Sequence, residues 1–485
     1  MSMVTRRLIG IGAGGPQVRP VQLVLASLGL LVCTNAPSTY TALHVIDNGT
    51  SHTWISLYPF GAVAVCGAVG LGRKLATVPW RKWPFPLFPL AAFVTWGLMS
   101  GVWSVSPTTT AINAMLAVGI AAFGCWIGWC LTMREQLYTV AMTAATCVVA
   151  SAIVVEWLSQ YGKMYPAQYP DSNWQGVFGN RNSLAPMCVL AMVGLAGYVA
   201  THPSVARVVV SIPVLMSSVV LLRGSSGATS LAALAATGTV AVAVPLAWLL
   251  KRWRVPGLVV ATGAVGACVA LWIWVMTHFD QVARWLSRER TLSGRRLIWQ
   301  DVRRFIRERP WKGYGLWAYW DRPELTSATY ARLGAQYASA HNSALEVLLG
   351  LGVVGLIFYL AVVLCAIVGV AAMVWSRRTV EVWWWAMLLA FLFVENLMES
   401  FVLWHSYNWV LFIAATLVPF GASIPSISTV VAPSDDEAED VGSPRTVPNP
   451  IAGAADPSRA DLIAHSEDGA FEVDLGDDVH WERVR

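Results

Sequence analysis

Charged residues are scarce in this 485-residue sequence. Asp, Glu, Lys and Arg make up 13% of it, whereas about a quarter of a soluble protein is charged. Hydrophobic residues make up 56%, and the mean hydropathy is +0.55. This composition excludes an ordinary soluble domain and predicts a polytopic membrane protein. We therefore expect the membrane, and no nucleic acid, among its partners.

Several other features are also missing. The eight cysteines lie inside apolar runs, without the spacing of a disulfide framework or a metal site. No carboxylate motif has metal-ligand spacing, so we expect no metal and no other cofactor. The first twenty residues carry arginines but no long apolar core, which argues against a cleavable signal. We find no internal repeat, which weighs against transporter folds built from duplicated halves.

What the sequence does contain is a series of apolar runs, each long enough to cross a bilayer with about 20 residues. They predict an all-α polytopic membrane protein with about twelve transmembrane helices and one large extracytoplasmic helical loop. The predicted spans begin near Val21, Ile55, Pro84, Ala111, Leu137, Asn182, Val208, Thr229, Pro256, Asn342, Val382 and Ser406. The predicted organisation is a cytoplasmic segment 1–20, about nine spans in 21–279, an outer catalytic loop 280–341, about three spans in 342–422 and a disordered tail 423–485.

Lysine and arginine are concentrated in alternate connections between the predicted spans. The intervening connections, 44–54 and 105–110, contain neither residue. By the positive-inside rule, both termini are predicted to be cytoplasmic. The basic connections contain Arg73, Lys74, Arg81, Lys82, Arg134, Arg207, Lys251, Arg252, Arg254, Arg377 and Arg378.

The C-terminal tail is acidic. From Gly421 onward it holds 14 acidic residues and four arginines, which leaves 29 basic and 14 acidic residues in the rest of the chain. The tail is rich in Ser, Pro and Gly and lacks periodicity, so we expect it to be disordered. It is a candidate for binding a cytoplasmic partner, although tails of this composition are often merely solvated.

The predicted outer loop is basic, with twelve basic and six acidic residues between positions 280 and 340. Loops of about sixty residues escape the positive-inside rule, and so many arginines outside suggest an anionic ligand. Helical periodicity predicts an amphipathic helix over Gly294–Arg309. Arg295 falls on its apolar face beside Trp299, so its guanidinium must reach an anion or a carboxylate inside the fold. Pro310 would end this helix, and Gly313 and Gly315 would form a tight turn.

Two stretches carry motifs that occur together in a known superfamily. The first is Gly176–Ala185, before a predicted span. The second contains Gly294-Arg295, Trp299, Pro310, Gly313-Tyr314-Gly315, His341-Asn342, Gly352 and Gly355. In this order they resemble the O-antigen ligase and O-antigen polymerase superfamily of bacterial inner-membrane glycosyltransferases. The resemblance covers roughly residues 90–420. One motif departs from the superfamily pattern. Within Leu222–Thr229, Ser226 stands where an arginine is expected, and Arg223 lies about one helical turn earlier.

The resemblance implies glycosyl transfer on the outer face of the bacterial cytoplasmic membrane. An acceptor hydroxyl would attack the anomeric carbon of an undecaprenyl-pyrophosphate-linked glycan, and the lipid pyrophosphate would leave. The acceptor would be a lipid, a protein or a glycan, and the sequence does not decide between a ligase and a repeat-unit polymerase. Three alternative hypotheses remain for the function. They are a rod-and-division type glycosyltransferase that relies on an outer carboxylate, a glycolipid transporter or flippase, and a non-catalytic scaffold.

His341 and Arg295 are the predicted catalytic residues. Histidine titrates near neutrality and suits the role of base for the acceptor hydroxyl. Arginine suits the pyrophosphate because its planar fork holds phosphate oxygens and stays charged. The competing structural role for Arg295 is an ion pair with Asp301 or Glu289. The predicted substrate-binding residues are Arg223, Arg296, Arg303, Asn342, Trp299, Asn180 and Asn182.

Carboxylates provide further candidates. Glu395 and Glu399 lie four residues apart in a predicted span, where ionisable residues are functional candidates. They would shape the acceptor cleft, or simply bond to backbone and tryptophan partners. Glu346, one turn after His341, would either orient it or only start a helix. Alternative outer bases are Asp171, Asp280, Asp321 and Glu324.

Overall fold

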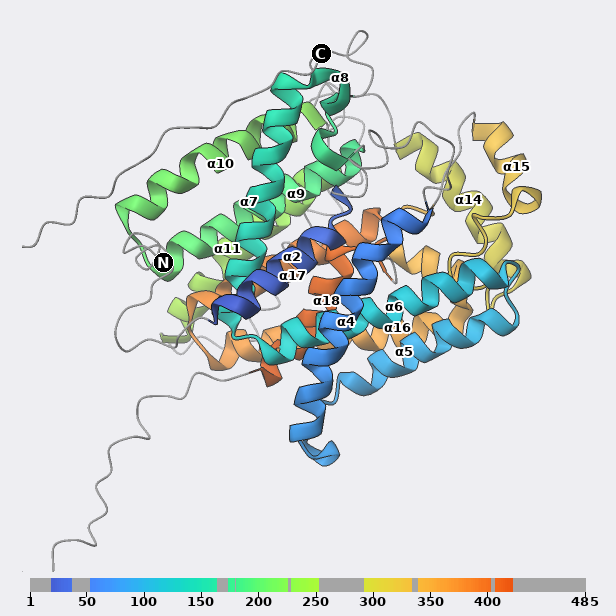
Figure 1. Ribbon diagram of the computed structural model, residues 1–485, viewed down its shortest axis with the longest axis horizontal. Coiled ribbons are helices and arrows are strands. Elements are labelled where there is room, and N and C mark those ends of the chain that lie inside the picture. Colours follow the sequence, from blue (N-terminus) through green and yellow to red (C-terminus); the bar gives the residue numbers. More distant parts are fainter. Residues whose placement is uncertain are drawn as a thin grey trace, which may run out of the picture. The chain divides into compact units, whose positions relative to one another are not determined.

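The computed structural model describes residues 19–36, 53–163, 173–178, 180–225, 228–252, 292–333, 339–402 and 406–421. The regular elements of this part are helices, apart from one isolated bridge between Lys163 and Trp174 (Figure 1). Eight of the helices are long and apolar enough to cross a membrane, and three shorter ones are apolar. The all-α polytopic membrane fold is therefore confirmed.

These eleven helices begin close to eleven of the predicted starts. The span predicted near Pro256 and the acidic tail lie outside the described residues. The helices are α2 (Pro20–Cys33), α4 (Thr53–Thr77), α5 (Leu87–Met99), α6 (Pro107–Cys130), α7 (Met133–Trp157), α9 (Arg181–Thr201), α10 (Val205–Ser225), α11 (Ala228–Arg252), α16 (Ser343–Ser376), α17 (Val380–Met398) and α18 (Tyr407–Leu417).

Helix α18 is the centre of the bundle, and all of its residues are buried. It packs closely against α6, where a side chain added at Gly124 or Gly128 would overlap Ile413 and Ala414 of α18. Small residues let membrane helices approach this closely, because lipid supplies no hydrophobic drive for helix association.

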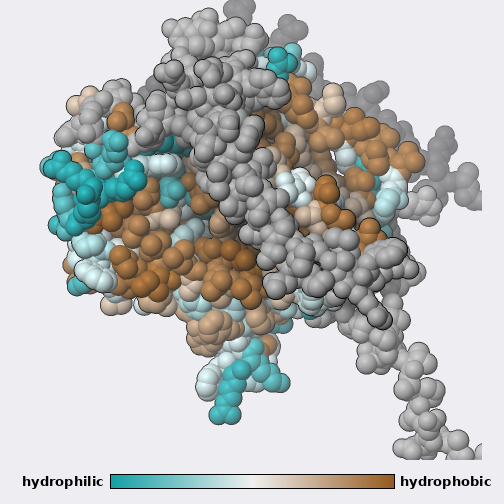
Figure 2. Space-filling model, turned by 180° about the vertical axis from the view of Figure 1, so that it is seen from behind, coloured by the Kyte–Doolittle hydropathy of each residue, from teal (hydrophilic) through white to brown (hydrophobic). Residues whose placement is uncertain are grey.

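The outer surface of the bundle is apolar. Helix α10 buries Ser211 and Ser218 while it exposes Val209 and Met216, the inverse of a helix on a soluble protein. Figure 2 shows apolar side chains over much of the surface, with hydrophilic side chains gathered around α14 (Leu292–Glu308) and α15 (Pro323–Leu333). An apolar belt of this kind is the surface that lipid chains solvate.

Basic residues from several connections meet at one end of the bundle, which we call the basic end. Arg19, before α2, pairs with Glu135 of α7 at 2.9 Å, and Arg134 pairs with Glu381 of α17 at 3.1 Å. The Arg207 guanidinium lies 4.4 Å from the ring centre of Tyr198. These contacts join the starts of α2, α7, α10 and α17 to the end of α9.

The helix predicted over Gly294–Arg309 is confirmed as α14, which lies beside α15 and α16 (Figure 1). The tight turn predicted after Pro310 is also present, because Gly313 and Gly315 have φ of +66° and +99°. Glycine is the residue that adopts such angles without steric cost.

This turn docks into a break in α16. The helix is interrupted at Gly352, where φ is +66° and a side chain would collide with the backbone of Trp311. Val353 N donates to Pro310 O at 2.8 Å, and Tyr314 N donates to Leu349 O at 2.9 Å. The loop thus binds backbone groups exposed by the break, which membrane-embedded chains require.

Candidate active site

Glu399, which directly follows α17, lies between Arg295 and His341. Its Oε1 accepts a hydrogen bond from Arg295 Nη2 at 2.6 Å, and its Oε2 lies 2.7 Å from His341 Nδ1. The Glu399 side chain is 9% exposed, and those of Arg295 and His341 are 15% and 20% exposed. One largely buried carboxylate therefore joins the two residues that the sequence predicts to be catalytic.

The partner of Arg295 differs from both structural partners considered for it. Arg295 Nη1 donates to Met398 O at 2.8 Å, and its ion pair is with Glu399 rather than with Asp301. Glu289, the other residue considered, lies outside the described residues. The inference that this guanidinium reaches a carboxylate inside the fold is confirmed, but the carboxylate lies 104 positions away in the sequence.

The backbone before His341 is clamped on both sides. Ala340 N donates to Glu346 Oε2 at 2.7 Å, and Ala340 O accepts from Trp299 Nε1 at 2.8 Å. His341 itself has φ of +49°, an angle that only surrounding contacts can hold in a non-glycine residue. Glu346 thus holds the chain beside His341 and makes no hydrogen bond to its ring among those observed. Trp299 is part of the same clamp.

Asn342 and its neighbours fasten the start of α16 to the end of α17. Asn342 Oδ1 caps α16 by accepting from Leu345 N at 2.9 Å, and its Nδ2 donates to Leu397 O at 2.8 Å. The Ser343 hydroxyl donates to Asn396 Oδ1 at 2.8 Å. Since both ends of the Asn342 amide are engaged, its contacts here are structural.

Glu399 is ionised. Burial by itself would raise the pKa of this carboxyl, but the neighbouring His341 and Arg295 outweigh burial and hold the pKa below its ordinary value. An ionised carboxylate only accepts hydrogen bonds. His341 Nδ1 must then carry the proton of their shared hydrogen bond, so Nε2 is the nitrogen through which a neutral ring would take up another proton.

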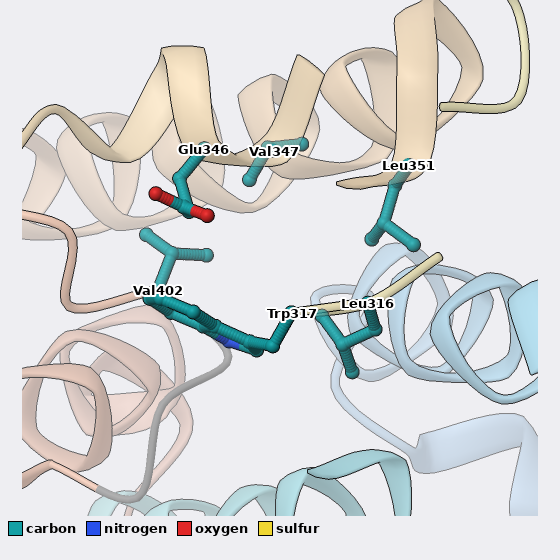
Figure 3. Close-up of a pocket in the computed structure, with 6 residues that line it drawn as sticks. All are labelled: Leu316, Trp317, Glu346, Val347, Leu351 and Val402. Atoms are coloured by element: carbon teal, nitrogen blue, oxygen red, sulfur yellow. The ribbon is translucent and has the colours of Figure 1, made fainter. Parts of the chain in front are cut away.

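Two further carboxyl groups are buried close by. Glu395 is fully buried one turn before Glu399, near Ser230. Glu346 points into a small cavity between α16 and the ring of Trp317 (Figure 3), with a volume of about 10 Å³. A cavity of that size has room for about one water molecule, so it is too small for a sugar or a lipid.

Two other predicted substrate-binding residues, Arg303 and Arg296, belong to α14. Arg303 is exposed one turn beyond Trp299, and its Nε donates to Trp299 O at 3.0 Å. Arg296 belongs to α14, but its side chain lies outside the described residues.

Arg223, Asn180 and Asn182 belong to a different neighbourhood. Asn180 caps α9, because its Oδ1 accepts from Asn182 N at 2.8 Å. Arg223 is exposed at the end of α10, and the next residue, Gly224, accepts from Trp174 N at 3.1 Å. The contacts seen in the described part of the chain connect residues 173–182 with the end of α10, and not with Glu399.

Of the alternative outer bases, Asp321 is already engaged. Its Oδ2 accepts from the Ser106 and Thr109 hydroxyls at 2.8 and 2.5 Å, and these bonds lower the pKa of Asp321. Glu324 is exposed at the start of α15. Asp171 and Asp280 lie outside the described residues. In the described part of the chain, no group of three or more His, Cys, Asp or Glu side chains is placed to hold a metal ion.

The sequence drew attention to Glu399 without identifying its partners. The available signal was an ionisable residue at the end of an apolar span. Its links to residues 58 and 104 positions away required the folded chain.

Comparison with known proteins gives one family match. Residues 212–360 match the family model described as O-Antigen ligase. No curated protein matches the sequence. The matched residues include Arg223, Arg295 and His341 but end before Glu399.

Proposed function

We propose, from the premise that residues 212–360 form an O-antigen ligase family domain, that this membrane protein transfers or polymerises undecaprenyl-pyrophosphate-linked glycan. The reaction would take place on the outer face of the bacterial cytoplasmic membrane. The observation that carries the proposal is that one buried carboxylate, Glu399, holds Arg295 and His341 side by side.

The proposed step forms one bond and breaks one. The oxygen of the acceptor hydroxyl attacks the anomeric carbon of the donor sugar, while the bond from that carbon to the pyrophosphate oxygen breaks. The hydroxyl proton passes to His341 Nε2, and the prenyl pyrophosphate leaves with the bonding electrons. Glu399, 2.7 Å from Nδ1, would stabilise the imidazolium that forms.

Arg295 would stabilise the departing charge. Guanidinium has five N–H groups, and Arg295 directs one from each terminal nitrogen at Met398 O and Glu399. Its remaining N–H groups suit pyrophosphate oxygens. A charge fixed in advance in a poorly hydrated site costs little reorganisation during the reaction. The exposed Arg303 and Arg223 would add to the attraction of the anionic donor.

The direct test uses the purified protein in detergent with a lipid-linked glycan donor. We expect transfer of glycan to an acceptor lipid or to a second lipid-linked glycan, with release of prenyl pyrophosphate. Transport has no meaning in detergent, so product formation distinguishes an enzyme from a flippase. If neither acceptor yields product with active donor, the proposal fails.

Ligase and polymerase are separated by the glycans of a knockout strain. Shortened glycans would identify a polymerase. Full-length glycan left on the lipid carrier would identify a ligase.

A further inference from the structure

A cleft lies at the end of α14 that is far from Arg295. Its volume is about 360 Å³, within the range of about 300–1,000 Å³ that small-molecule sites occupy, and it is lined by Trp103, Arg309, Pro310, Trp311, Lys312 and Gly313. The walls are held together, because Trp103 Nε1 donates to Lys312 O at 2.9 Å. The cleft is therefore built from the loop docked on α16 and the chain that follows α5.

The cleft holds two cations beside aromatic rings. Lys312 Nζ lies 5.4 Å from the ring centre of Trp103, and the Arg309 guanidinium lies 4.7 Å from that of Tyr314. Both cations are exposed, and neither forms an ion pair with a carboxylate in the described part of the chain. The adjacent acid, Glu308, instead accepts from Tyr314 and lies 3.7 Å from Arg304.

The segments that form the cleft expose apolar side chains. Trp311, which lines the cleft, is 67% exposed, and Val102, next to the lining residue Trp103, is 89% exposed. Leu98 and Met99, at the end of α5, are 44% and 49% exposed. Exposed apolar residues on a membrane helix face lipid chains, and tryptophan favours the level of the headgroups. The cations and these exposed apolar side chains thus match the phosphate and the upper chains of one lipid molecule.

The cleft is distinct from the site at Glu399. Arg309 directly follows α14 and lies fourteen positions after Arg295, so about 21 Å of helix rise separates them. A diphosphate bound at Arg295 does not reach the cleft lined by Arg309 and Lys312.

We propose that this cleft binds the phosphate of an anionic glycerophospholipid at the membrane surface. Arg309 and Lys312 supply the charge, and Trp103 and Trp311 supply the walls. The inference rests on the cleft and on the membrane fold, and not on the proposed glycosyl transfer.

The test is native mass spectrometry of the purified full-length protein with phosphatidylglycerol or zwitterionic phosphatidylcholine. We expect the wild type to retain phosphatidylglycerol preferentially. The Arg309→Gln/Lys312→Gln variant should retain it about tenfold less, since each basic residue near a membrane surface contributes to anionic lipid binding. The matched control is Arg304→Gln/Arg307→Gln, which removes the same charge from α14 outside the cleft and should change retention less than about twofold.

Three results would overturn the assignment. They are equal retention of the two lipids by the wild type, equal losses in the two double variants, and displacement of phosphatidylglycerol by an equimolar short-chain prenyl pyrophosphate. The last result would reassign the cleft to a lipid-linked pyrophosphate. If the cleft double variant is poorly folded by size-exclusion chromatography, the single Lys312→Gln variant replaces it, with a smaller expected loss and the same criteria.

Discussion

The two ends of the helix bundle use the same arginine–glutamate chemistry in different ways. At the basic end, Glu135 is fully buried and accepts from three nitrogens of Arg19 and from Thr132 N. At the other end, Glu399 divides its two oxygens between Arg295 and His341.

The two carboxylates differ in whether a partner can change its protonation state. The partners of Glu135 are backbone groups, the Thr132 hydroxyl and a guanidinium, and none of these changes protonation over the ordinary pH range. One partner of Glu399 is an imidazole, a group that can accept and donate a proton during a reaction. A buried arginine–glutamate pair is therefore weak evidence of function by itself, and the shared histidine is what favours chemistry at Glu399.

The largest expected effect comes from removing that histidine. We expect His341→Ala to reach the membrane at normal levels yet lose about 100-fold or more of its transfer rate, because general base catalysis contributes about that much. Transfer is measured with purified protein and a lipid-linked donor. The control is His202→Ala, which removes an exposed histidine at the basic end and should transfer normally. Near-normal transfer by His341→Ala would exclude His341 from the mechanism.

The two carboxylates should respond differently to the same substitution. Glu399→Gln should lower the transfer rate about tenfold or more, because the imidazolium loses its neighbouring charge. Glu135→Gln should instead lower stability by about 1–2 kcal/mol, since Arg19 is 45% exposed and solvent screens the loss. Thermal unfolding and transfer per folded molecule are measured for both variants. The contrast breaks down if Glu135→Gln impairs transfer as much as Glu399→Gln.

The Arg223→Gln variant tests whether exposed arginines outside the Glu399 cluster help to bind the donor. Arg223→Gln should raise the KM for the lipid-linked donor about tenfold with little change in kcat, because the loss of a positive charge that attracts the anionic donor weakens binding without changing the chemical step. The matched control is Arg73→Gln, an exposed arginine that follows the apolar part of α4, with no expected change in KM. An unchanged KM in Arg223→Gln would remove Arg223 from the predicted binding residues.

The smallest expected effect is on the pH dependence of stability. Because the pKa of Glu399 in the folded protein lies below its ordinary value of 4.5, the ionised carboxylate contributes stability that is fully present above about pH 4.5. That contribution is lost as the pH falls through the lowered pKa. The difference in melting temperature between wild type and Glu399→Gln should therefore stay constant above about pH 4.5 and shrink as the pH falls further, through the lowered pKa. A difference that grows as the pH falls below about 4.5 would contradict an ionised Glu399.

Much of the fold was predictable from local patterns. Apolar runs located the starts of eleven helices, because crossing a bilayer demands a continuous apolar segment whatever its neighbours are. The period of α14 and the glycines at 313 and 315 were equally local signals. The sequence did not predict the break in α16 at Gly352. The break accommodates the backbone of Trp311, which is distant in sequence, so no local pattern indicates it.

The amino-acid sequence was sufficient to predict the membrane fold, the amphipathic helix that carries Arg295 and a site role for His341. Each of these follows from composition, from periodicity, or from motifs in a fixed order. The folded chain was needed to show that Glu399 joins Arg295 and His341, and that Arg309 and Lys312 share a cleft with Trp103. Those partners lie on segments that are far apart along the chain, and their pairing depends on how the helices pack, which the local chemistry of a single segment does not specify.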